Sequence, residues 1–165
     1  MKTKVLNHTD IESILKRMAY QIYENNFNDK NITLVGISSR GFEIAKLLKL
    51  QLEEISNLKV NLFELTIDKV SPAAENIKIE PLLVKLKGSV VIVDDVLNTG
   101  RTLIYAALPF LNIKIEKIQI AVLVDRNHKK FPVFADYKGI ELNTTFQEHV
   151  SVELNKKKQF EVYLQ

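Results

Sequence analysis

Residues 90–102 read VVIVDDVLNTGRT, the most informative stretch of the chain for its fold. Residues 90–93 form a continuous apolar run, the pattern of a central parallel strand covered on both faces. Asp94 and Asp95 follow where we expect that strand to end. A short turn then leads into residues 102–111, whose apolar spacing is typical of a helix. The order strand, acid pair, turn and helix indicates an α/β protein.

The turn after the acid pair has the chemistry of a phosphate site. Backbone amides in such a turn, together with the N-terminus of the following helix, make a concave array of donors that suits a phosphate. A glycine lets the backbone approach the anion closely, and threonine hydroxyls add further donors. We expect this cradle to consist of Asn98, Thr99, Gly100, Arg101 and Thr102.

The two carboxylates indicate which kind of phosphate binds. Beside an anion, Asp94 and Asp95 would be repulsive unless they faced hydroxyl groups or a Mg²⁺ ion. Carboxylates accept hydrogen bonds from vicinal sugar hydroxyls. The combination therefore favours a ribose phosphate over a bare phosphate.

Three alternative interpretations explain less of the stretch. A Walker B strand also ends in acidic residues, but the chain has no G-x-x-x-x-G-K-[ST] sequence, which argues against a P-loop ATPase. Adjacent acids also follow strands in receiver-like metal sites, which leaves the TGRT turn unexplained. A charged surface turn does not account for strand, acids, turn and helix in register.

Strand and helix patterns alternate through the rest of the chain. Thr9 and Glu12 form a capping-box pattern that predicts a helix running to about Asn25. Strands are predicted at residues 32–37, 60–67 and 118–124, a polar turn at 38–41, a second long helix at 42–55, and a closing hairpin of strands 150–154 and 160–164 around an NKKK turn.

Two segments contain prolines that limit regular structure. Residues 68–88 include Pro72 and Pro81 and show no clear period, so we expect mostly a mobile loop there. Pro109 is expected to kink or end the helix that begins near residue 102. The whole pattern predicts a doubly wound parallel sheet in a single domain, residues 1–165.

The composition excludes several classes of site. The 165 residues suffice for one domain with a real core, and the absence of cysteine excludes disulfides, thiolate metal sites and cysteine nucleophiles. No stretch approaches the roughly 18 to 20 apolar residues that cross a bilayer, and the N-terminal MKTKVLNHTD lacks a signal-peptide core. We therefore expect a cytoplasmic protein. The net charge of +3 permits an anionic ligand without demanding one.

Four segments resemble one enzyme family, in the family's order. VVIVDDVLNTGRT resembles the phosphoribosyl-pyrophosphate loop of type I phosphoribosyltransferases, and most closely that of the PyrR family of bifunctional pyrimidine operon attenuation proteins and uracil phosphoribosyltransferases. LVGISSRG resembles the family's pyrophosphate segment, LKRMAYQIYE its first helix, and IQIAVLVDRNHKKFPVFADYKG its base-side segment. Together these segments cover most of the chain.

The resemblance implies a reaction as well as a fold. It implies a doubly wound core, a hood of added strands over the sugar site, and a homodimer or larger assembly. The reaction would transfer phosphoribose from 5-phosphoribosyl-1-pyrophosphate (PRPP) to uracil, giving UMP and pyrophosphate, with Mg²⁺ as cofactor. Purine-specific relatives generally carry a carboxylate at the position of Asn98, and an amide cannot serve as that proton acceptor. A pyrimidine base is therefore favoured.

The resemblance also implies roles for individual residues. Asp94 and Asp95 would hold the ribose hydroxyls and contact the metal only indirectly, through those hydroxyls or water. The base would lie near Asp125 and Arg126. The 5-phosphate would bind the cradle at residues 98–102. Pyrophosphate would bind Ser38, Ser39, Arg40 and Gly41. The implied catalytic residues are Arg40, Asp94 and Asp95.

The chain departs from the family pattern in ways that favour a second hypothesis. Glu64, Leu65 and Thr66 stand for a usual Arg-Asp-Asp run, Gly139, Ile140 and Glu141 stand for Gly-Lys-Asn, and Asn98 stands where uracil-type relatives often have tyrosine. The alternative is a UMP-sensing, RNA-binding regulator of pyrimidine genes with weak or absent catalysis. Lys16 and Arg17 would contribute to its RNA surface, although the same residues also suit an ordinary polar helix face.

Overall fold

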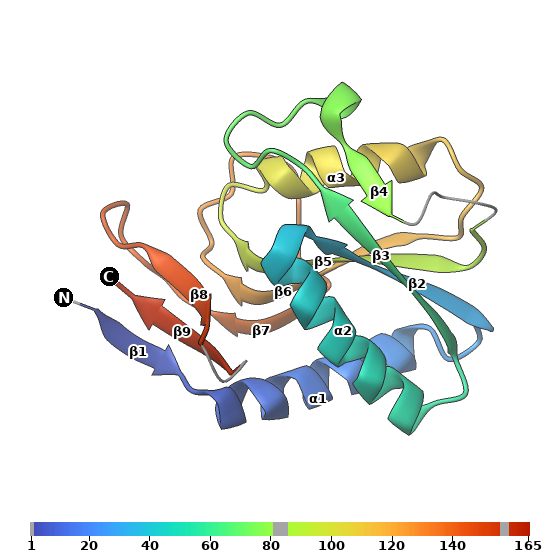
Figure 1. The fold of residues 1–165 in the computed structure, drawn as a ribbon, viewed down its shortest axis with the longest axis horizontal. Helices are drawn as coiled ribbons and strands as arrows, with labels where there is room; N and C mark the ends of the chain where they lie inside the picture. Colours follow the sequence, from blue (N-terminus) through green and yellow to red (C-terminus); the bar gives the residue numbers. More distant parts are fainter. Residues whose placement is uncertain (1, 81–85, 156–158) are drawn as a thin grey trace.

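The computed structural model describes residues 2–80, 86–155 and 159–165, and a six-stranded sheet forms its centre (Figure 1). Along this sheet the order is β4 (Lys78–Glu80), β3 (Lys59–Thr66), β2 (Asn31–Ile37), β5 (Ser89–Leu97), β6 (Ile118–Asp125) and β7 (Tyr137–Glu141). Neighbouring strands are parallel except at the edge, where β4 pairs antiparallel with β3. The expected doubly wound sheet is confirmed.

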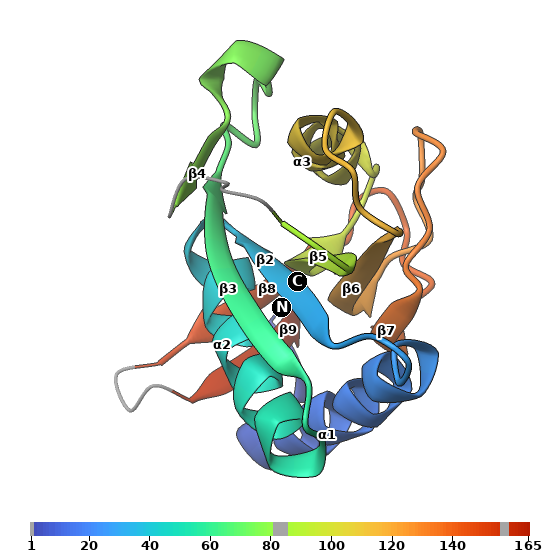
Figure 2. The ribbon, with the colours of Figure 1, turned by 90° about the vertical axis from the view of Figure 1, so that its right-hand side faces the viewer.

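Helices cover both faces of this sheet (Figure 2). α1 (His8–Asn25) and α2 (Ser38–Ile55) lie on one face, and α3 (Arg101–Leu111) lies on the other. Successive residues of the central strands point to opposite faces, so Leu34 packs in the core under α1 and α2 while Val35 packs in the core under α3. Burial on both faces explains the continuous apolar runs of β2 and β5.

A second, three-stranded sheet adjoins the first helix. Its antiparallel order is β1 (Thr3–Leu6), β9 (Phe160–Leu164) and β8 (Val150–Leu154), which brings the two chain ends side by side (Figure 1). Val152 and Val162 are buried in the same core as α1 and α2. The predicted hairpin is confirmed, although residues 156–158 of its NKKK turn lie outside the described residues. β1 and β7 were not predicted.

The cap of the first helix differs from the expected one. Asn7 is the N-cap, its side chain accepts a hydrogen bond from the Asp10 amide at 3.0 Å, and the Asp10 carboxylate accepts one from the Asn7 amide at 2.9 Å. The capping box is therefore Asn7 and Asp10, and the prediction of Thr9 and Glu12 was wrong. Both pairs fit the spacing rule, and the sequence alone does not choose between them.

Strand β5 is longer than predicted, and α2 begins earlier. β5 pairs with β2 only as far as Val93, but its pairing with β6 continues to Leu97. Asp94 and Asp95 therefore lie within the strand, past the point where it has lost β2 as a neighbour. The expected polar turn 38–41 is instead the first turn of α2, entered through Ser38 at a φ of 49°.

The remaining differences concern the proline-containing segments. Within residues 68–88 the structure has a short 3-10 turn, η1 (Ala74–Asn76), and strand β4, so the prediction of mostly loop was wrong in part. Residues 81–85 of that segment lie outside the described residues. α3 ends at Leu111, shortly after Pro109. None of the helices in the described part of the chain has the length and apolar character needed to cross a bilayer.

Replacing the observed cap tests the start of α1. Asn7→Ala removes the acceptor for the Asp10 amide, and we expect a loss of about 0.5 to 2 kcal/mol in the free energy of unfolding. Thr9→Ala is the matched control, because the cap interactions use Asn7 and Asp10. Urea unfolding of both variants measures the difference. A larger loss for Thr9→Ala than for Asn7→Ala would contradict the observed cap.

Candidate active site

The acid pair lies at the crevice between β2 and β5, where the strand order reverses. The connection from β2 to β3 runs through α2 on one face of the sheet, and the connection from β5 to β6 runs through α3 on the other face. In open α/β sheets ligands bind at such a switch point, outside the carboxyl ends of the strands. Asp94 and Asp95 occupy this position because β5 continues beyond the end of its pairing with β2.

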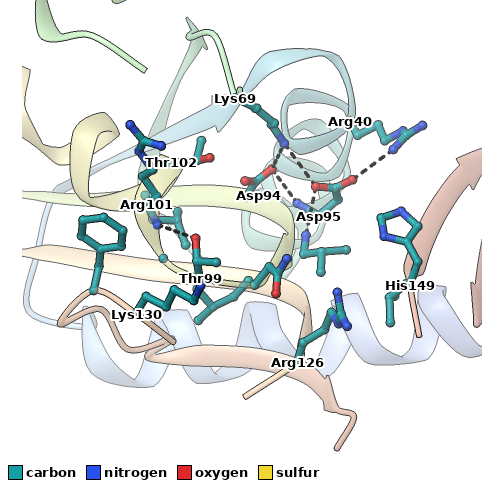
Figure 3. A pocket seen from close by; sticks show the side chains of 17 residues that line it. Arg40, Lys69, Asp94, Asp95, Thr99, Arg101, Thr102, Arg126, Lys130 and His149 are labelled. Atoms are coloured by element: carbon teal, nitrogen blue, oxygen red, sulfur yellow. Dashed lines mark hydrogen bonds and ion pairs between the residues drawn. The ribbon is translucent and has the colours of Figure 1, made fainter. Parts of the chain in front are cut away.

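The two carboxylates are buried but partnered. Asp94 is 2% exposed and Asp95 is 5% exposed. Asp94 Oδ1 accepts a hydrogen bond from the Asp95 amide at 2.9 Å, and Asp95 Oδ1 accepts one from the Val96 amide at 3.0 Å. Lys69 Nζ lies 2.8 Å from Asp94 Oδ1 and 3.4 Å from Asp95 Oδ1, while Arg40 Nη1 lies 3.6 Å from Asp95 Oδ2 (Figure 3). Two cations thus compensate the buried charge.

The environment separates the pKa values of the two acids. Burial, together with the charge of Asp95, raises the pKa of Asp94 to about 7 against the opposing effect of Lys69. Burial also acts upward on Asp95, but the charge of Lys69, the hydrogen bond with Asp94 and the charge of Arg40 outweigh it and lower that pKa. Below about pH 7 the pair therefore shares one proton and one negative charge.

The predicted phosphate cradle forms the turn between β5 and α3. Gly100 is the N-cap of α3 with a φ of 85°, so the N-cap itself has no capping side chain, although Thr99 Oγ1 accepts a hydrogen bond from the Arg101 amide at 3.3 Å. A Cβ at Gly100 would strain this backbone and lie 3.2 Å from Val133 Cβ. The Thr99 carbonyl accepts hydrogen bonds from the amides of Lys130 at 2.9 Å and Phe131 at 3.1 Å, which braces the turn from the next loop. The next amides of the first turn, those of Thr102 and Leu103, are left for a ligand.

A cleft of about 540 Å³ joins the acid pair to the cradle. Its wall includes every residue of the cradle, and apolar side chains such as Leu97 and Val150. Apart from the two acids, its charged and titratable side chains are cationic or imidazole groups (Figure 3). These are Arg40, Lys69, Arg101, Arg126, Lys130 and His149. The described part of the cleft therefore suits a ligand with several negative charges and hydroxyl groups.

The start of α2 approaches the acid pair from the side of β2. A Cβ at Gly41 would lie 2.6 Å from the Val93 carbonyl oxygen and 3.1 Å from Asp94 Cα, so glycine permits this close approach. Arg40 lines the cleft, and Ser39 lines a smaller adjacent pocket. The N-cap of α2 is Ile37, which gives no side-chain cap within the described chain. Amides of the first turn of α2, which begins at Ser38, thus form a second donor array.

The base-side residues hold the loops beyond β6. Arg126 lines the cleft, yet its guanidinium also donates to Thr144 Oγ1 at 3.0 and 3.1 Å and to the Glu148 carbonyl at 2.6 Å. The Asp125 carboxylate pairs with Lys129 at 3.0 Å. Arg126 therefore positions the segment leading to His149, which immediately precedes β8, while the Asp125 carboxylate pairs with a lysine of its own loop.

Of the charged or titratable residues that line the cleft, the sequence pattern did not single out Lys69, Lys130 or His149. Lys69 and Lys130 carry no distinguishing pattern in a chain with 23 Lys and Arg residues. One local signal precedes Lys69: Asp68 follows β3, and its carboxylate accepts hydrogen bonds from the amides of Val70 and Ser71 at 2.8 and 3.2 Å. This turn places Lys69 over the acid pair.

Two of the three departures from the family pattern lie in strands, whereas Asn98 lies in the turn after β5. Glu64, Leu65 and Thr66 belong to β3, where Glu64 pairs in register with Glu80 of β4. The segment that follows this strand includes Asp68 and Lys69, so a cation does stand near the acid pair. Gly139, Ile140 and Glu141 belong to β7, away from the cleft wall.

Lys16 and Arg17 lie on the exposed side of α1, outside the cleft. Arg17 donates to the carbonyl oxygens of Gly139 at 2.5 Å and Lys138 at 3.2 Å, so it ties α1 to β7. Lys16 is exposed. Among the described residues, no group of three or more histidine, cysteine or acidic side chains could hold a metal ion.

Removing the titrating carboxyl group should prevent part of the stability loss that the unsubstituted protein shows as the pH rises. Because the pKa of Asp94 is about 7 when folded against an ordinary value of 3.8, the unfolded chain releases this proton first, and stability falls between about pH 4 and pH 7. The difference in unfolding free energy between Asp94→Asn and the unsubstituted protein should therefore shift in favour of the variant by about 1 to 3 kcal/mol between pH 5 and pH 8. Urea unfolding at both pH values measures this change, and a constant difference would contradict the assignment.

Comparisons with known proteins agree on one family. Residues 1–157 match the family model described as the phosphoribosyl transferase domain. Two relatives named bifunctional protein PyrR, from Oceanobacillus iheyensis and Clostridioides difficile, are each 35% identical to the chain. The alignments cover 96% and 93% of this chain, and 93% and 91% of the respective relatives.

Solved structures show the same fold. A hypoxanthine-guanine phosphoribosyltransferase from Bacillus anthracis has a TM-score of 0.71 at 19% identity, covering 87% of this chain and 84% of its own. A hypoxanthine phosphoribosyltransferase from Trypanosoma cruzi, in complex with IMP, has a TM-score of 0.71 at 19% identity, covering 87% and 78%. Matches at this identity show a shared fold, whereas the family model and the 35% identical relatives show family membership. The chain therefore belongs to the phosphoribosyltransferase family and, within it, to the PyrR proteins.

Proposed function

We propose that this protein transfers phosphoribose from PRPP to a pyrimidine base, with uracil as the base and UMP and pyrophosphate as products. The observation that carries the proposal is the buried acid pair, which lies in one cleft with the glycine-capped N-terminus of α3 and a set of cations. Buried carboxylates suit vicinal hydroxyls, and the amide arrays suit phosphates. A ribose carrying phosphate groups at both ends matches all three features.

The cleft suggests how the ligand is oriented. The 5-phosphate would lie on the amides and hydroxyls of residues 98–102, and the ribose hydroxyls would bind Asp94 and Asp95. The pyrophosphate would then face Arg40 and the first turn of α2, which approaches the acids through Gly41. The base would enter beside Arg126 and His149. The fold thus supplies separate donors for the two phosphate-bearing ends.

Charge placement is the catalytic contribution expected from these residues. As the bond to pyrophosphate breaks, positive charge develops on the sugar and negative charge on the leaving group. The acid pair is negative and lies where the sugar would bind, while Arg40 and the α2 amides lie where the leaving group would depart. Leu97, Phe131 and Val150 form apolar parts of the wall, which limits the access of water.

The residues present fit Mg²⁺ as an ion bound mainly through the ligand. Mg²⁺ usually keeps several waters and binds one or two carboxylates together with substrate phosphates. The described chain provides two acids and no larger ligand cluster, and both acids already contact Lys69. Asp94 and Asp95 would therefore hold the ion indirectly, through ribose hydroxyls or water. The ion would supply charge neutralisation for pyrophosphate.

The base preference rests on Asn98 and on the relatives. Asn98 lines the cleft at the turn, and its amide cannot accept a proton from a purine ring. The two relatives at 35% identity are PyrR proteins, whereas the hypoxanthine and hypoxanthine-guanine phosphoribosyltransferase structures share the fold at 19% identity. These observations support uracil over hypoxanthine or guanine.

Release of pyrophosphate tests the proposed reaction. With PRPP and Mg²⁺, uracil should give pyrophosphate, while orotate, hypoxanthine, guanine and adenine should give little. Asp95→Asn should lower kcat/KM for PRPP by roughly 100-fold or more with folding intact, because the ribose loses its charged acceptor. Asp29→Asn is a matched control, since Asp29 binds Ser89 at the opposite end of β5. No release with any base would refute the proposed reaction.

An RNA-binding regulator is the second candidate. Its support is the bifunctional name of the relatives together with the exposed Lys16 on α1. RNA binding should strengthen with UMP, weaken with salt, and fall several-fold in Lys16→Glu. Lys16 is a cleaner test than Arg17, because Arg17 also ties α1 to β7. Lys49→Glu on α2 serves as the charge-matched control, and undetectable or salt-independent RNA binding would refute this candidate.

A further inference from the structure

Lys69 occupies a place in the site that the proposed reaction assigns to the ligand. Its ammonium contacts Oδ1 of Asp94 at 2.8 Å and Oδ1 of Asp95 at 3.4 Å. These two oxygens belong to neighbouring residues of β5, and one amine bridges them as a pair of vicinal hydroxyls would. A ribose whose hydroxyls bind these two oxygens must therefore displace Lys69.

The backbone turn around Lys69 orients its side chain toward the acid pair. Asp68 closes a turn on Val70 and Ser71, which fixes the direction in which the lysine leaves the backbone. Figure 3 shows the side chain reaching down to the carboxylates from above the cleft. The lysine is still 41% exposed, so its ammonium can move aside into the open cleft without leaving the site.

Charge balance decides which ligands can displace it. Once the ammonium leaves, the buried Asp94 and Asp95 lose their nearest cation, and Arg40 is 3.6 Å away from Asp95 alone. In the proposed orientation the 5-phosphate lies on residues 98–102, and the pyrophosphate faces Arg40, which shares Asp95 with Lys69. A sugar that carries pyrophosphate therefore brings an additional anion beside Asp95, where the displaced ammonium finds a new partner.

We propose that Lys69 is a specificity-determining residue, which in the free protein stands in for the ribose hydroxyls at the acid pair and so selects sugars that carry pyrophosphate. The inference rests on the proposed function, because it assumes that ribose binds Asp94 and Asp95. Lys69 opposes the binding of ribose 5-phosphate. It favours PRPP by pairing with pyrophosphate after displacement.

Substituting the ammonium separates these two effects. Lys69→Met keeps an unbranched side chain and removes the charge. Binding of ribose 5-phosphate should become roughly three- to tenfold tighter, and binding of PRPP should weaken or stay the same, so the ratio of the two affinities falls. Calorimetry without divalent cations measures both, since a metal ion could replace the ammonium. Lys49→Met, which alters a pair with Glu53 on α2, is the matched control.

A double-mutant cycle tests the contact without any ligand. Urea unfolding of Lys69→Met, Asp95→Asn and the double variant gives the coupling between the two side chains. We expect the two substitutions to be non-additive, as for groups in direct contact. Additive effects would overturn the inference, because Lys69 would then not hold the acid pair in solution.

The outcomes distinguish this inference from the proposed function. Tighter binding of ribose 5-phosphate to Lys69→Met, with a lowered affinity ratio, supports the role of Lys69. Unchanged or weaker binding of ribose 5-phosphate overturns that role while the proposed function stands, provided that the unsubstituted protein binds PRPP. Failure of the unsubstituted protein to bind PRPP overturns the proposed function and this inference with it.

Discussion

Asp94 and Asp95 are adjacent and almost fully buried, on the part of β5 that extends beyond its pairing with β2. Burying two adjacent carboxylates is costly unless cations and hydrogen bonds compensate them. The amides of Asp95 and Val96, the ammonium of Lys69 and the guanidinium of Arg40 provide this compensation. The groups that compensate the buried charge of the two acids also lie where a sugar phosphate would be bound. The need to compensate this charge therefore shapes the site.

The fold brings these groups together through close packing at the switch point of the sheet. Gly41 lets the start of α2 approach the β5 backbone, and Gly100 turns the chain from β5 into α3. Two helix N-termini whose N-cap residues, Ile37 and Gly100, give no side-chain cap therefore meet at one crevice. Helix starts give up stability when they lack caps, and a doubly anionic ligand restores partners to their amides. Binding and folding thus depend on the same backbone groups.

Periodicity predicted the central strands and long helices well, because apolar residues on both faces leave a clear pattern in sequence. Boundaries were less predictable: the acid pair lies inside β5 because pairing with β6 continues, and pairing partners are not visible along a single strand. Lys69 was missed for a similar reason, since a tertiary contact over 25 residues gives one lysine its role. The homo-oligomer and the cytoplasmic location implied at the sequence level stay predictions.

A crystal structure of the protein with PRPP would show whether the acid pair binds the ribose. We expect ribose hydroxyls on the carboxylates of Asp94 and Asp95, the 5-phosphate on the amides of residues 98–102, and Lys69 displaced from the acid pair. PRPP bound elsewhere, or bound in the cleft while Lys69 still bridges the two carboxylates, would contradict this expectation.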